Sequence, residues 1–168
     1  MTSFPRPVRI EFTRPKGKFL PIFSWAVRLI EGTPYSHVRI RWQSTSGEEL
    51  VYEASGSSVK LLGSYSGMVD KAEVLAVHTF YLDSDQYKKL IRLFRYAGVK
   101  YGVIQIFGIA LARLLRLKKN PLSKGKSIQV CSELAGLFIS DVLGVDVPNL
   151  DLIGPRGIKE LLDRCCDV

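Results

Sequence analysis

Apolar and polar residues alternate in several short segments of the first half of the chain, a pattern typical of strands with one buried face. After His37, every second residue is apolar: Val38, Ile40 and Trp42. Arginines fill the two positions between them, so one face of this strand is apolar and the other is charged. Similar runs predict strands at Val8–Phe12, Val51–Ala54 and Glu73–Leu82, with two or three strands in all between His37 and Leu62.

Turn-forming residues indicate how two of these strands pair. Residues Ser44–Glu49, which include Gly47, are typical of a hairpin loop. This loop would place the strand Val51–Ala54 beside the strand that begins at His37. We therefore expect the carboxylate of Glu53 to lie one strand away from the histidine.

Four other segments carry apolar residues at the spacing of a helix, about 3.6 residues per turn. They are Leu20–Glu31, Ser84–Tyr96, Val103–Leu117 and Ser132–Leu143. Gly32 ends the first of these helices, and Gly144 is a typical stop for the last. Cys131 comes directly before the last helix, so its thiol is expected at a helix N-terminus.

Cys131, His37 and Glu53 have complementary chemistry. A helix N-terminus and a nearby imidazolium both favour the thiolate form of a cysteine, which is its nucleophilic form. His37 would act as the general base and later return a proton to the leaving group. Glu53 would accept a hydrogen bond from the second ring nitrogen and fix the tautomer. The backbone N–H of Cys131 and the hydroxyl of Tyr35, two residues before the histidine, would stabilise an oxyanion.

Four segments together resemble a known family of thiol hydrolases. They are residues 35–38 (Tyr-Ser-His-Val), 51–54 (Val-Tyr-Glu-Ala), 101–115, and 130–134 (Val-Cys-Ser-Glu-Leu). Their order and spacing resemble the permuted branch of the NlpC/P60 superfamily of papain-like enzymes. Within that branch they are similar to the YiiX/YebB-like proteins and, more distantly, to the lecithin:retinol acyltransferase-like proteins.

The resemblance implies an α+β, circularly permuted papain-like fold, with an antiparallel sheet packed against helices, as a single domain over residues 1–168. It also implies a catalytic triad with Cys131 as nucleophile, His37 as base and Glu53 as the third polar residue. Tyr35 occupies the position of an oxyanion-stabilising tyrosine in the wider relatives. Arg39 departs from the pattern, because this group often has a small residue there, and a long charged side chain would change the substrate groove.

Each of these residues also has an ordinary structural interpretation. A cysteine before an apolar helix is often a small hydrophobic core residue, and a strand histidine is often structural. Glu53 could be an exposed strand residue, and Tyr35 could serve packing. The family order of all four favours the catalytic interpretation. Glu133, in the first turn of the helix, is interpreted as an acid that stabilises the helix N-terminus.

Composition and net charge limit the classes of binding partner and cofactor that we expect. The net charge of +8 favours an anionic partner, such as a membrane or cell-wall surface, and no aromatic-interleaved basic motif indicates nucleic acid. Three cysteines do not suit a disulfide framework, so we expect a reducing compartment and interpret Cys165 and Cys166 as an ordinary tail. The histidines and cysteines form no metal-ligand cluster, and we expect no metal and no cofactor.

Residues Met1–Phe12 lack the pattern of a signal peptide. We expect a cytoplasmic location, unless the protein is phage-encoded or specially delivered.

The sequence therefore predicts a cysteine amidase or peptidase, acting through an acyl-enzyme on Cys131 on a small peptide or cell-wall-derived amide. Two alternatives stay open: a lipid acyltransferase or deacylase at a membrane surface, and a non-catalytic interaction domain. The apolar segment Val103–Leu117 bears on this choice and is too short to span a membrane. We favour a buried helix that lines the site over a membrane-contacting helix, which would suit a lipid-like amide or ester. The oligomeric state is left open.

Overall fold

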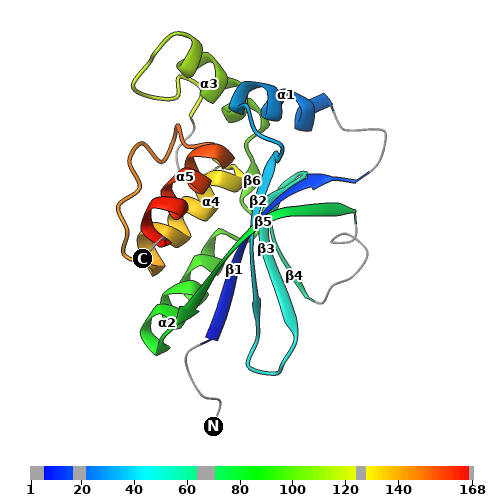
Figure 1. The fold of residues 1–168 in the computed structure, drawn as a ribbon, viewed down its shortest axis with the longest axis vertical. Helices are drawn as coiled ribbons and strands as arrows, with labels where there is room; N and C mark the ends of the chain where they lie inside the picture. Colours follow the sequence, from blue (N-terminus) through cyan, green and yellow to red (C-terminus); the bar gives the residue numbers. More distant parts are fainter. Residues whose placement is uncertain (1–5, 17–21, 64–70, 124–127, 167–168) are drawn as a thin grey trace.

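The computed structural model describes residues 6–16, 22–63, 71–123 and 128–166, and in these ranges it forms one seven-stranded sheet (Figure 1). The strands are β1 (Arg6–Pro15), β2 (His37–Gln43), β3 (Glu49–Ser55), β4 (Ser58–Gly63), β5 (Ala72–Leu82), β6 (Lys100–Tyr101) and β7 (Ile128–Gln129). Their spatial order is β5-β1-β2-β3-β4-β6-β7. Every neighbouring pair is antiparallel except β6 and β7, which run parallel.

The helices cover one face and one end of this sheet. They are α1 (Ile22–Glu31), α2 (Ser84–Arg92), α3 (Val103–Leu114), α4 (Cys131–Leu137) and α5 (Pro155–Cys166). A short 3-10 helix, Leu93–Tyr96, follows α2, and a π-helical turn, Phe138–Val142, continues α4. The expected start of the first helix at Leu20 lies outside the described residues. The α+β class implied by the resemblance is confirmed.

The core lies between the sheet and the helices α2, α4 and α5, which Figure 1 shows on one side of the strands. Its buried side chains include Val8, Ile10 and Phe12 of β1, Leu134 of α4, and Ile158 and Leu162 of α5. The apolar face of β2 also lies in this core, as the alternating pattern predicted. The charged face of β2 is not open to solvent, however, because Arg39 is buried and pairs with Glu11 of the neighbouring strand β1.

Helix α5 lies beyond the elements expected from the sequence. Its buried residues Ile158, Leu161 and Leu162 recur at helical spacing, and Pro155 occupies the first helical position, which suits proline. The interpretation of the cysteine pair as an ordinary tail is wrong, since Cys165 lies in the last turn of this helix. Its thiol is free and exposed.

Glu31 joins three segments at the end of the molecule that carries α1 and α3. Its carboxylate is buried, lies 2.5 Å from Nη1 of Arg113 in α3, and accepts the backbone N–H of Arg156 at 3.2 Å. Burial raises the pKa of Glu31, although both arginines oppose the shift. Gly154 approaches so closely that a Cβ there would lie 2.0 Å from Oε1 of Glu31. The ends of α1 and α3 and the start of α5 are therefore held by one carboxylate.

Helix α3 has a buried side and an exposed side. Gly108, Ile109 and Ala112 are buried, whereas Ile104 and Leu114 are exposed. The expectation of a buried helix is therefore wrong for its outward side. Among the described residues, no helix combines the length and the apolar character needed to cross a bilayer.

Candidate functional site

Cys131 is held at the N-terminus of α4 by contacts of the two residues that follow it. The hydroxyl of Ser132 donates to the carbonyl of Ile153 at 2.6 Å, and the carboxylate of Glu133 accepts the N–H of Val130 at 3.1 Å. As the first helical residue, Cys131 has a backbone N–H with no acceptor inside the helix. This N–H stays available as an oxyanion donor.

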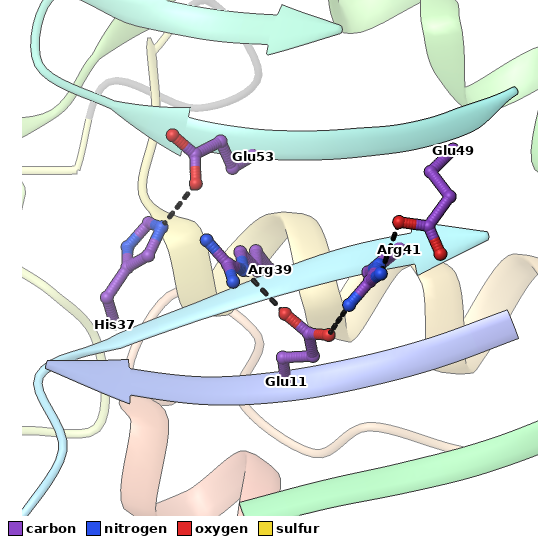
Figure 2. Close-up of polar contacts among 6 residues, drawn as sticks. All are labelled: Glu11, His37, Arg39, Arg41, Glu49 and Glu53. Carbon is purple, nitrogen blue, oxygen red and sulfur yellow. Dashed lines mark hydrogen bonds and ion pairs between the residues drawn. The ribbon is translucent and has the colours of Figure 1, made fainter. Parts of the chain in front are cut away.

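His37 and Glu53 come from adjacent strands and face one another. Nε2 of His37 lies 3.1 Å from Oε2 of Glu53, as Figure 2 shows. The hydroxyl of Ser55 donates to the other carboxylate oxygen, Oε1, at 2.5 Å. The hairpin inferred from Gly47 is present, because β2 and β3 pair antiparallel. It brings the histidine and the carboxylate together as expected.

The thiol and the imidazole also meet. The charge of Cys131 and hydrogen bonding to its side chain are among the causes that raise the pKa of His37. Because Nε2 is engaged by Glu53, Nδ1 is the ring nitrogen left for the sulfur. Burial alone would lower the pKa of His37, but the negative charges of Cys131 and Glu53 outweigh burial and raise this pKa to about 10. The imidazole is therefore held as an imidazolium next to the sulfur.

The pKa of Glu53 is shifted in the opposite direction, downward. Burial would raise its pKa, yet the hydrogen bond and charge of His37, with help from Ser55 and Arg39, lower the pKa to about 2. Glu53 is therefore ionised whenever the imidazolium is present. The imidazole of His37 therefore pairs with the carboxylate of Glu53 through Nε2 and interacts electrostatically with Cys131.

A tyrosine contacts the thiol, and it is Tyr101 rather than the expected Tyr35. Burial, followed by the charge of Cys131 and hydrogen bonding to its side chain, raises the pKa of Tyr101, on β6, well above the ordinary value. Tyr35 packs its ring on Phe12 with centroids 5.1 Å apart. Burial raises the pKa of Tyr35, and the next contributions come from acidic groups of α5, led by Asp163. Its oxyanion role stays a prediction.

The sequence indicated Tyr101 only as a member of segment 101–115, one of the four segments on which the family resemblance rests. No local motif marks it, because β6 has only two residues and its position depends on pairing with β7. This parallel pair brings the chain of Tyr101 beside the chain that leads into Cys131. A long-range contact, rather than a spacing, decides which hydroxyl meets the sulfur.

The imidazole lines a groove, whereas the thiol lines a separate recess. The groove has a volume of about 500 Å³ and is lined by His37, Glu53 and Tyr101 together with hydroxyls such as that of Ser36. Cys131 is only 3% exposed and lines a narrow apolar recess of about 20 Å³ between α1 and α3. Ser36 lines both spaces, so the groove and the recess are adjacent at this residue.

A buried ion network lies beside the site on the same face of the sheet (Figure 2). Nε of Arg39 lies 2.7 Å from Glu11, which also pairs with Arg41 at 3.1 Å, and Arg41 pairs in turn with Glu49. The Nη2 atom of Arg39 is buried and has no hydrogen-bond partner among the described residues. Arg39 also lines the groove, and its charge is balanced by Glu11.

Glu133 has the expected helix-stabilising contact and an unusual ionisation. Burial raises its pKa to about 7, with a smaller contribution from Asp151, while the N–H of Val130 opposes the shift.

The described residues contain no group of three or more His, Cys, Asp or Glu side chains arranged to hold a metal ion.

In comparisons with family models, curated proteins and solved structures, no match to this chain was found.

Proposed function

We propose that this protein is a cysteine hydrolase that cleaves an amide or ester bond through an acyl-enzyme on Cys131. The observation that carries the proposal is the contact of one imidazole with both the Cys131 thiol and the Glu53 carboxylate. An imidazolium beside a sulfur at a helix N-terminus favours the thiolate, the nucleophilic form of cysteine. A cysteine that served only as a core residue would not need a charged partner.

In the first step the Cys131 thiolate attacks the carbonyl carbon of the substrate, and the π electrons move to the carbonyl oxygen. The backbone N–H of Cys131 and the hydroxyl of Tyr101 would donate hydrogen bonds to the developing oxyanion. When the tetrahedral intermediate collapses, the carbon–nitrogen bond breaks and His37 donates its proton to the leaving amine. The product of this step is a thioester on Cys131.

In the second step water hydrolyses the thioester. Neutral His37 takes a proton from the water, whose oxygen attacks the acyl carbon, and the carbon–sulfur bond then breaks to release the acid and the thiolate. Glu53 accepts from Nε2 throughout, which keeps Nδ1 directed at the reacting groups. The ion pair of thiolate and imidazolium is restored.

The order of these elements also supports a circularly permuted papain-like fold of the NlpC/P60 kind. The strand of His37 and the strand of Glu53 precede the helix of Cys131, and α4 packs on both β2 and β3. We propose a peptide-like or cell-wall-derived amide as the acyl donor. The buried Nη2 of Arg39, which has no hydrogen-bond partner among the described residues, suits a donor with a hydrogen-bond acceptor near the scissile bond.

Acylation by p-nitrophenyl acetate, followed by mass spectrometry at mildly acidic pH, tests the proposal. Cys165 is a free, exposed thiol in the same chain and serves as an internal reference. We expect the acetyl group on Cys131 before Cys165, in spite of the burial of Cys131, because Cys131 has an imidazolium partner.

The matched variants are His37→Ala and His78→Ala, which each remove one of the two histidines. The first is expected to abolish the preference for Cys131, and the second is expected to leave it intact. Equal modification of Cys131 and Cys165, unchanged by His37→Ala, would rule out a thiol hydrolase and favour an interaction domain.

A further inference from the structure

Helix α1 exposes a stripe of apolar side chains. Ile22, Trp25 and Leu29 recur at helical spacing, and their exposed fractions are 85%, 56% and 66%. The opposite side of the helix is the buried one, with Val27 and Glu31. A helix on the surface of a water-soluble domain normally has a polar outward face, so this stripe calls for a partner.

Helix α3 repeats the same arrangement. Ile104, Leu111 and Leu114 are exposed on its outward side, Leu114 to 79%, while Gly108 and Ala112 are buried on the other side. We name the surface made by Ile22, Trp25, Leu29, Ile104, Leu111 and Leu114 the α1–α3 face. Its two helices lie together at one end of the molecule in Figure 1.

Two contacts show that the helices form one surface. Ile30 of α1 and Ile106 of α3 line the same narrow recess, and Arg113 of α3 lies 2.5 Å from Glu31 at the end of α1. The two apolar stripes therefore lie on neighbouring helices. A scattered exposed leucine needs no explanation, but two exposed apolar stripes on neighbouring helices do.

The charges within α3 and the segment that follows it are of one sign. Residues 100–123 contain five basic residues and no acidic one. Arg116, Lys118 and Lys119 follow α3 directly and are exposed, and the one acidic residue of α1, Glu31, is buried against Arg113. An apolar surface with a cationic border complements the acyl and headgroup regions of an anionic bilayer.

We propose that the α1–α3 face docks the protein on the surface of an anionic phospholipid bilayer, with the two helices lying in the interface. Helix α3 has 12 residues, which suits an interfacial helix and not a membrane span. A second copy of the chain would suit the α1–α3 face less well than an anionic bilayer. Two-fold pairing of this face would gather the same basic residues of both copies, and no acidic partner would be provided.

Docking would also place the candidate site at the bilayer. Val103, the first residue of α3, lines the groove of His37, and Ile106 lines the recess of Cys131. An amide or ester held by a lipid would then reach the thiol without leaving the membrane surface. This step rests on the proposed function, whereas the docking itself does not depend on catalysis.

Vesicle co-sedimentation and tryptophan emission test the docking on the full chain. The probes are vesicles of phosphatidylcholine alone and vesicles with one third phosphatidylglycerol. The chain has two tryptophans, and Trp42 is only 3% exposed, so a blue shift on binding reports Trp25. We expect binding and a blue shift with the anionic vesicles, weaker binding with phosphatidylcholine alone, and weaker binding at high salt.

Two variants separate the apolar and the cationic contributions while keeping Trp25. Leu29→Ser with Leu114→Ser is expected to weaken binding roughly tenfold or more at any salt concentration. Lys118→Gln with Lys119→Gln is expected to weaken binding roughly tenfold at low salt and little at high salt. Circular dichroism and thermal melting confirm that each variant is folded.

The controls make each failure informative. Val77→Ser with Tyr81→Ser removes exposed apolar side chains from β5 and is expected to bind as the wild type does. Cys131→Ser is expected to bind vesicles normally while losing acylation, so docking and catalysis fail separately. Absence of wild-type binding, or equal loss in the β5 control, would overturn the proposal. A dimer in sedimentation velocity that the Leu29 and Leu114 variant abolishes would overturn it too, because the face would then pair two copies.

Discussion

The chain has two histidines, and each contacts a carboxylate at nearly the same distance. Nε2 of His37 lies 3.1 Å from Glu53, and Nε2 of His78 lies 3.2 Å from Asp163. Both histidine side chains are mostly buried. Judged by this contact alone, the two regions would be equivalent.

The surroundings separate them. His37 has a thiol on its other side and opens into a groove, whereas His78 lies between β5 and α5 and shares Asp163 with Lys159 at 2.7 Å. A lysine on the carboxylate competes with the histidine for the same negative charge. A histidine–carboxylate pair therefore indicates a candidate site only when a nucleophile and an open space accompany it.

The largest expected difference between the two regions is in catalysis. His37→Ala is expected to lower the rate of acyl transfer to Cys131 by about 10³-fold, because the proton donor and the partner of the thiolate are both lost. His78→Ala is expected to leave that rate unchanged. Single-turnover kinetics with an activated ester measure both, and an equal loss in the two variants would remove the distinction.

Replacing the carboxylate partner of His37 is expected to affect stability in a pH-dependent way. The pKa of Glu53 is lowered from 4.5 to about 2, so its ionised form stabilises the fold above pH 4.5 and this stabilisation is lost as the pH falls toward 2. Glu53→Gln is expected to lower the free energy of unfolding by about 3 kcal/mol at pH 6. Urea denaturation at pH 6 and pH 3 measures the loss, which should be smaller at pH 3.

Glu133, two residues after the thiol, is expected to give the opposite pH dependence of stability. Its pKa is raised from 4.5 to about 7, so the fold favours its neutral form, and the fold is destabilised as the pH rises through this window. Glu133→Gln removes this dependence and still offers an oxygen to the N–H of Val130. From pH 5 to pH 7.5 the variant should gain about 2 kcal/mol relative to the wild type in urea denaturation. A constant difference at both pH values would contradict the assignment.

The smallest effect is expected at the second histidine pair. Asp163→Asn removes the partner of His78 and Lys159, but Asp163 is 41% exposed and such pairs contribute little. We expect a loss of about 0.5 kcal/mol or less at pH 6 in urea denaturation. A loss as large as that of Glu53→Gln would show that the two carboxylates are energetically alike.

Much of the frame that holds the candidate site follows from local patterns. The alternation after His37 and the loop at Gly47 predict β2, β3 and their pairing, and the helical spacing after Cys131 predicts α4. These features depend on residues near one another in sequence, where the period of apolar side chains is informative. The meeting of the thiol with the imidazole was expected from the complementary chemistry of the two residues and from the resemblance, not from the period of apolar side chains.

The remaining features depend on contacts between distant segments. Arg39 follows the pattern of a solvent-facing residue, and its burial depends on Glu11 of β1, which the sequence of β2 does not reveal. Tyr101 meets Cys131 only because β6 pairs with β7. The exposure of α3 was missed for a similar reason. An apolar helix has the same sequence pattern whether protein or lipid covers its second side.

Because Glu31 holds three helices together, a substitution at Gly154 would affect all three. A methyl group added to Gly154 would overlap the carboxylate, whose nearest oxygen is 2.0 Å from where that carbon would sit. Displacing the carboxylate would release Arg113 and the amide of Arg156 at once, so a change of one small group would loosen the anchoring of three helices. Hydrogen exchange of α1 and α3 in a Gly154→Ala protein would record that loosening, far along the sequence from the altered residue.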